Sequence, residues 1–160
     1  DIFFQVEFAS IIKLFLEGED VTRELMLEST ASRASILALD FGVRAALTAR
    51  QRLFAISPGL VADGRDMGTV VFPNATLKFF LTANIETRAR RRYKQLLLRG
   101  DNVSLPAIWR QLEERDERDT KRSISPLVPA KDAIKLDTTN MVAGEVVEAV
   151  MNILVDRGFF

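Results

Sequence analysis

Arginine recurs at helical spacing in the stretch RDERDTKR. Arg115, Arg118 and Arg122 fall within a narrow arc of a helix, and Asp119 lies on the same side. Guanidinium groups bind anionic oxygens through paired hydrogen bonds, so such a stripe could hold a phosphate group. A charged face that only meets water has the same spacing. The spacing alone leaves both interpretations open.

A second candidate is the segment DGRDMGT at residues 63–69, which follows the apolar run at residues 60–62. Arg65 offers hydrogen-bond donors beside the acceptor carboxylate of Asp66, and the glycines allow a ligand to approach the backbone. If the apolar run is a parallel strand, the segment lies at the sheet edge where α/β proteins bind ligands. An ion pair between Arg65 and Asp66 inside a tight turn is the alternative.

The residue types that are absent narrow the chemistry. The 160 residues contain no Cys and no His, which excludes thiol nucleophiles, disulfides and imidazole bases. Phosphoryl transfer remains possible because it needs mainly positioning and charge neutralisation, and hydrolysis by two carboxylates remains possible as well. The formal net charge is zero, which gives no reason to expect nucleic acid or a membrane as partner. We expect a monomeric cytoplasmic protein.

The order of apolar runs and long amphipathic segments predicts an α/β fold with a parallel sheet flanked by helices. Alternation over residues 4–8 and 12–16 predicts a β-hairpin that turns at Ala9 and Ser10. Helical spacing begins at Thr22 and lasts until the break at residues 57–59. Short strands are expected at residues 60–62, 76–81 and 133–136, and long helices at 86–99, 104–122 and 143–157.

The helix expected over residues 86–99 carries further arginines, and two consecutive arginine faces argue against a purely solvated role. Trp109 has helical spacing with apolar neighbours and is expected to pack in the interior rather than to stack on a base. On the helix expected over residues 86–99, the arginines on one side are Arg88, Arg91, Arg92 and Arg99.

One glycine pair imitates a phosphate-binding loop. Residues 59–66 have the spacing G-x-x-x-x-G-R-D, but the apolar run lies between the two glycines instead of before them. Asp66 also occupies the position of the hydroxyl that holds magnesium, and its carboxylate would repel phosphate. The segment is therefore not a phosphate-binding loop.

The strings LVADGRDMGTVVFP at residues 60–73 and RDERDTKRSISPLVPAKDAIKLDTT at 115–139 resemble matching stretches of bacterial cytidylate kinases. Residues 16–22 and 35–44 are similar as well, so the resemblance extends over essentially all 160 residues. It implies a P-loop nucleoside monophosphate kinase fold whose N-terminal strand, phosphate loop and helix precede the first residue here. Residues 1–56 would form part of the monophosphate-binding subdomain, and residues 57–160 the core with a lid region at about 104–127.

The resemblance further implies transfer of a phosphoryl group from ATP to CMP or dCMP, with Mg²⁺ accompanying ATP and no metal site on this chain. Asp66 would accept a hydrogen bond from the cytosine amino group, and Arg44 would donate to the ring acceptors. Arg65 and Arg122 suit the phosphate, and Arg115 and Arg118 would neutralise charge on the transferring group. The residues expected to bind CMP are Ser35, Arg44, Arg65, Asp66, Asp119 and Arg122, with Ser35 and Asp119 at the ribose hydroxyls.

Without the phosphate loop, kinase activity of this chain is expected to be impaired. A non-catalytic nucleotide-binding or interaction module that has lost the loop is the alternative, and a purely structural α/β domain is a third.

Overall fold

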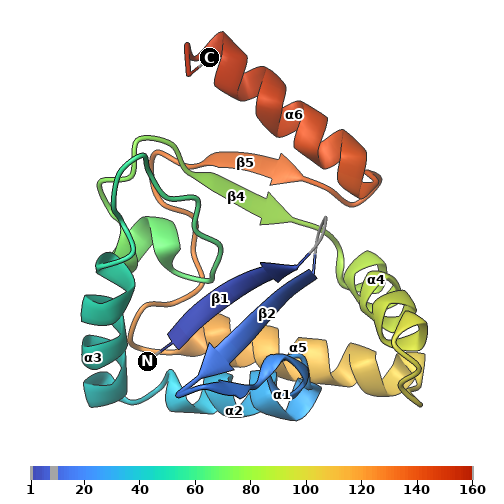
Figure 1. Cartoon of the computed structure of the whole chain (residues 1–160). Coiled ribbons are helices and arrows are strands. Elements are labelled where there is room, and N and C mark those ends of the chain that lie inside the picture. Colours follow the sequence, from blue (N-terminus) through green and yellow to red (C-terminus); the bar gives the residue numbers. More distant parts are fainter. Residues whose placement is uncertain (1, 8–10, 160) are drawn as a thin grey trace. The chain divides into compact units, whose positions relative to one another are not determined.

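A computed structural model describes residues 2–7 and 11–159 of the chain (Figure 1). The chain divides into two compact units, Asp1–Gln51 and Arg52–Phe160, which we call the N-terminal and the C-terminal unit.

The N-terminal unit begins with the predicted hairpin. Strands β1 (Ile2–Glu7) and β2 (Ile11–Leu16) pair antiparallel, and the two-residue strand β3 (Glu19–Asp20) extends the sheet beside β2. The hairpin is confirmed, while its predicted turn at Ala9 and Ser10 lies outside the described residues. Glu17 and Gly18 have φ angles of 52° and 90°, the left-handed conformation that reverses the chain between β2 and β3.

Three helices follow, α1 (Thr22–Leu25), α2 (Glu28–Leu37) and α3 (Phe41–Arg52). Aspartate side chains satisfy free backbone donors near the starts of α1 and α3. Asp20 accepts from the Thr22 amide at 3.0 Å, and Asp40 accepts from the Val43 amide at 2.8 Å. The segment predicted as helical from Thr22 therefore consists of three helices separated by short breaks.

The C-terminal unit contains a two-stranded parallel sheet of β4 (Phe79–Thr82) and β5 (Ile134–Asp137) (Figure 1). Parallel strands need a crossover connection, which is provided here by α4 (Ile85–Leu98) and α5 (Leu105–Lys121). The helix α6 (Ala143–Asp156) follows β5. These strands and helices were predicted close to their observed bounds.

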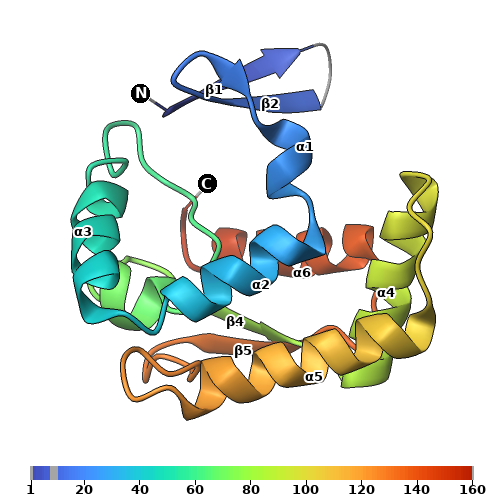
Figure 2. The same cartoon turned by 90° about the horizontal axis from the view of Figure 1, so that it is seen from below.

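The two crossover helices share a small apolar core. Ala89 and Leu96 of α4 pack with Ile108 of α5, and each is at most 3% exposed. Figure 2 shows the start of α5 lying against α4. The Ser104 side chain caps the first turn of α5, and Gly100, with φ of 83°, ends α4 as its position in the sequence predicts. The packing fixes the helix that carries the candidate residues Arg115, Arg118 and Asp119.

One predicted strand is wrong. Residues 60–62 form no strand, and Val61 is fully exposed. An apolar run becomes a strand only where a neighbouring strand offers backbone partners, and β4 and β5 pair with each other. The chain instead forms a single wide turn of π-helix, η1 (Met67–Val71), directly after Asp66.

Arg91 of α4 was expected on an anion-binding face but has a structural role instead. Its guanidinium group donates to the hydroxyl of Thr138 at 3.1 Å, to the carbonyl of Thr138 and to that of Met141 at 2.7 Å. Thr138 also binds the Thr82 carbonyl through its hydroxyl at 2.9 Å. Arg91 therefore holds α4 to the ends of both strands of the parallel sheet.

Lys78 and Asp132 form an ion pair next to the parallel sheet. The Lys78 ammonium is buried and donates to both carboxylate oxygens of Asp132, at 2.7 and 2.9 Å, and to the Pro73 carbonyl at 2.6 Å. The hydrogen bond from Lys78 lowers the pKa of the Asp132 carboxyl below its ordinary value of 3.8. The pair therefore joins the segment before β4 to the segment before β5.

The depressed pKa of Asp132 predicts a loss of stability in acid. A carboxyl group whose pKa is lower in the folded state stabilises the fold above its unfolded pKa, and this stabilisation disappears as the pH falls through the folded value. We expect the stability of Asp132→Asn to fall less between about pH 6 and pH 2 than that of the wild type. Urea unfolding across this range measures the difference. Parallel curves for the two proteins would contradict the role of the pair.

Candidate functional site

Ion pairs join arginine and aspartate side chains from three segments of the C-terminal unit. One arginine comes from the loop before η1, one from α4, and the others from α5 and its C-cap. We call this group the arginine cluster. Its members are Arg65, Arg88, Arg115, Asp116, Asp119 and Arg122.

Asp119 is the buried carboxylate of the arginine cluster, with a side chain only 3% exposed. Its Oδ2 lies 3.5 Å from Arg65 Nε and 3.8 Å from Arg115 Nε. Its Oδ1 lies 3.7 Å from Arg122 Nη1. Burial of a lone carboxylate is costly, and three surrounding guanidinium groups offset that cost. The structure therefore brings three of the predicted site residues together around a fourth, Asp119.

Arg122 is held by the turn that follows α5. Its Nε donates to the Ser125 carbonyl, and the positive φ of Ser125, 51°, belongs to this turn. The Leu127 amide then donates to the Asp119 carbonyl at 2.8 Å, which brings the chain back against the helix end. Arg122 is 8% exposed, an unusual environment for an arginine. The turn therefore fixes the position of this guanidinium group.

The arginine cluster carries more positive than negative charge, because four guanidinium groups surround two carboxylates. Within the described part of the chain, the buried atoms Arg122 Nη2 and Arg118 Nε have no hydrogen-bond acceptor. Leaving a buried donor unsatisfied costs about 1–3 kcal/mol. Excess positive charge and unsatisfied donors together fit an anionic ligand with several oxygens, such as a phosphate group.

Asp66 is held by the start of η1 and is 8% exposed. Its carbonyl accepts from the amides of Val70 at 2.9 Å and Val71 at 3.2 Å. Arg52 secures the far end of this turn by donating to the carbonyls of Val70 and Val71, both at 2.9 Å. The Asp66 backbone is therefore well fixed. Its neighbour Arg65 forms its ion pairs with α5, which favours a role beyond a local turn.

The remaining two predicted residues belong to the N-terminal unit. Ser35 lies on α2 and is 6% exposed, and Arg44 lies on α3. Their participation in the same site stays a prediction.

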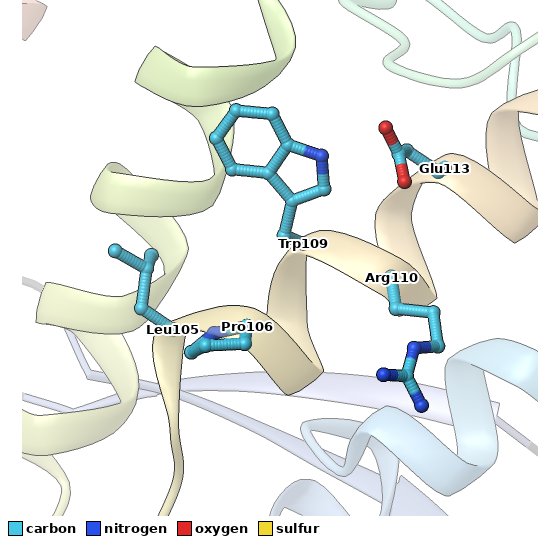
Figure 3. A pocket seen from close by; sticks show the side chains of 5 residues that line it. All are labelled: Leu105, Pro106, Trp109, Arg110 and Glu113. Atoms are coloured by element: carbon cyan, nitrogen blue, oxygen red, sulfur yellow. The ribbon is translucent and has the colours of Figure 1, made fainter.

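A shallow pocket of about 380 Å³ lies over the first turns of α5 and is separate from the arginine cluster (Figure 3). Figure 3 shows the side chain of Trp109 pointing toward α4. Trp109 packs against the core formed by Ala89, Leu96 and Ile108, which confirms the predicted packing role. The lining residues are Leu105, Pro106, Trp109, Arg110 and Glu113.

Asp116 was not predicted as a site residue. It lies three residues before Asp119 on α5, and this spacing places two acidic side chains on neighbouring positions of one face. Arg88 was predicted only as a member of an arginine face, whereas the structure pairs it with Asp116. The spacing of Asp116 and Asp119 was the signal in the sequence from which Asp116 could have been predicted as a site residue.

The described residues do not form a metal site of their own. Among residues 2–7 and 11–159, no group of three or more acidic side chains is arranged to hold a cation. The two aspartates of the arginine cluster are ion-paired with arginines. No helix in this part of the chain has the length and apolar character needed to cross a membrane.

A family model described as cytidylate kinase matches residues 2–156 of this chain. A cytidylate kinase from Stutzerimonas stutzeri is 54% identical over 144 residues, which are 90% of this chain and 63% of the relative. One from Vibrio cholerae is 54% identical over 141 residues, which are 88% of this chain and 63% of the relative. One from Pseudomonas putida is 48% identical over 155 residues, which are 97% of this chain and 68% of the relative.

Proposed function

Because the chain belongs to the cytidylate kinase family, we propose that it provides the nucleoside monophosphate site for phosphoryl transfer from ATP to CMP or dCMP. The chain spans 63% of the length of the Stutzerimonas relative that it matches. The observation that carries the proposal is the arginine cluster, with its excess positive charge and the buried, unsatisfied donor Nη2 of Arg122. The products would be CDP or dCDP and ADP.

The roles proposed for the side chains follow from their charge. Arg65 and Arg122 would bind the phosphate of CMP, because both guanidinium groups lie beside the buried Asp119. Arg115 and Arg118 would neutralise charge that develops on the transferring phosphoryl group. Asp119 would orient these arginines, and with Ser35 it would accept from ribose hydroxyls. Arg44 would donate to the acceptors of the base.

Mg²⁺ would arrive with ATP. Magnesium in kinases is held largely by substrate phosphates and water, with one or two carboxylates from the protein. The acidic side chains of the arginine cluster do not fit this ion, since each is already paired with guanidinium groups. We therefore assign no magnesium ligand to the described residues.

Asp66 is the proposed determinant of base specificity. A buried carboxylate can accept a hydrogen bond from the cytosine amino group, whereas uracil has a carbonyl oxygen at that position, and two acceptors repel. We expect CMP to bind this chain at least about tenfold more tightly than UMP. Calorimetric titration with both nucleotides measures the ratio.

The variant Asp66→Asn is the matched test, because an amide has the same shape and can donate to uracil. It is expected to lose most of the preference for CMP while it still binds mononucleotides. Equal binding of CMP and UMP by the wild type would show that Asp66 does not select the base. CMP binding without formation of CDP from ATP would support a non-catalytic nucleotide-binding module.

A further inference from the structure

Arg65 is the one phosphate-binding candidate that lies on a loop of the C-terminal unit. It precedes η1, whereas Arg115 and Arg118 belong to α5 and Arg122 is the C-cap of that helix. A loop side chain that is 35% exposed has considerable rotamer freedom. Orienting the guanidinium group before the ligand arrives lowers the entropic cost of a phosphate contact. Contacts that hold Arg65 in place would therefore favour phosphate binding.

Two carboxylates on successive turns of α5 hold the Arg65 guanidinium group. Its Nε lies 3.5 Å from Asp119 Oδ2, and its Nη1 lies 3.7 Å from Asp116 Oδ1. These distances are longer than hydrogen bonds, so the aspartates attract the group without occupying its donors. The closest approaches of Arg65 to the two carboxylates are made through Nε and Nη1. The group is oriented and still able to bind an anion.

Asp116 is itself anchored from a different helix. Its Oδ2 lies 2.5 Å from Arg88 Nη1, the shortest ion pair of the arginine cluster. The Nε of Arg88 donates at 3.0 Å to the carbonyl of Ala83, the residue directly after β4. A continuous series of polar contacts therefore runs from the end of the parallel sheet through Arg88 and Asp116 to Arg65.

We infer that Asp116 and Arg88 are positioning residues that orient Arg65 toward the phosphate of the bound nucleotide. This inference rests on the proposed function, since it concerns the same site. Neither residue needs to contact the ligand. Asp116 sets the direction of the Arg65 side chain, and Arg88 keeps Asp116 from turning away into solvent.

A positioning role and a simple charge effect make opposite predictions for Asp116→Asn. Removing this negative charge makes the arginine cluster more positive, so charge alone would tighten CMP binding. Loss of orientation would weaken it. We expect CMP affinity to fall roughly tenfold, the cost of losing one charge-assisted hydrogen bond. Cytidine lacks the phosphate, and its affinity is expected to change by less than about twofold.

Arg88→Lys is the second variant. Lysine keeps the positive charge but lacks the fork that binds the Ala83 carbonyl and Asp116 together. If only the charge of Arg88 mattered, the affinity for CMP would not change. If Arg88 is a positioning residue, the affinity for CMP should fall about as much as in Asp116→Asn. The double variant should bind CMP about as weakly as either single variant, because both changes break one series of contacts. Glu117→Gln on the same helix, whose exposed partner is Lys121, is the control and should not affect binding.

Calorimetric titration of each variant with CMP and with cytidine separates the outcomes. Unchanged or tighter CMP binding by Asp116→Asn, while the wild type binds CMP, would overturn the positioning role and leave the proposed function intact. An equal loss of CMP and cytidine affinity would overturn it too, because that result indicates general damage to the fold. No CMP binding by the wild type would overturn the proposed function and this inference with it.

Discussion

Replacing Arg122 by alanine is expected to lower the affinity for CMP by about two orders of magnitude. The guanidinium group is 8% exposed, and its Nη2 is buried without an acceptor among the described residues. If it binds the phosphate through charge-assisted hydrogen bonds, its loss should cost about 3 kcal/mol, or roughly 100-fold. Calorimetric titration with CMP measures this effect.

Arg122→Lys separates charge from geometry. Lysine keeps the positive charge but lacks the planar fork of arginine, which can bind the Ser125 carbonyl and a phosphate group at the same time. We therefore expect most of the affinity for CMP to be lost. Arg110→Ala is the control, because Arg110 is exposed on the same helix and outside the arginine cluster. Wild-type affinity in a folded Arg122→Ala protein would exclude Arg122 from the site.

The largest effect on stability is expected from Arg91→Ala. Arg91 donates to Thr138 and to the Met141 carbonyl, which lie 47 and 50 residues further along the chain. Charge-assisted hydrogen bonds in a partly buried place should together contribute about 2–3 kcal/mol. The free energy of unfolding in urea measures this contribution.

Arg90→Ala is the matched control for this prediction. Arg90 is the preceding residue on α4, and its ion pair with Glu86 joins side chains that are 63% and 55% exposed. Exposed pairs four residues apart on a helix contribute little, so we expect a change below about 0.5 kcal/mol. Equal losses for the two variants would show that Arg91 does not connect α4 to the sheet.

The sequence predicted best those elements whose ends have local chemical signals. The start of α5 follows from a serine that caps the helix and a proline in its first turn, and both signals lie within a few residues. Gly100 likewise marks the end of α4. The arc formed by Arg115, Asp119 and Arg122 depends only on helical periodicity, so these members of the arginine cluster could also be predicted.

Features that depend on distant partners could not be predicted in the same way. The apolar run at residues 60–62 has the composition of a strand, but its conformation depends on whether another strand lies beside it. The arginines of α4 look alike in the sequence. Arg91 binds carbonyls after β5, while Arg88 binds Asp116, and only the tertiary packing separates these roles. Helical spacing alone suggested a common face.

The packing of α5 on α4 has a mechanical consequence for the charged side chains that α5 carries. A helix rises about 1.5 Å per residue, so Arg115 and Arg122 are separated by roughly 10 Å along one stiff rod. The helix α5 packs on α4 through the tight contact of Ile108 with Ala89 and Leu96. A change of volume in that contact would displace all the arginines of α5 by a similar amount. Apolar atoms outside the arginine cluster therefore fix the helix whose arginines we propose to bind phosphate.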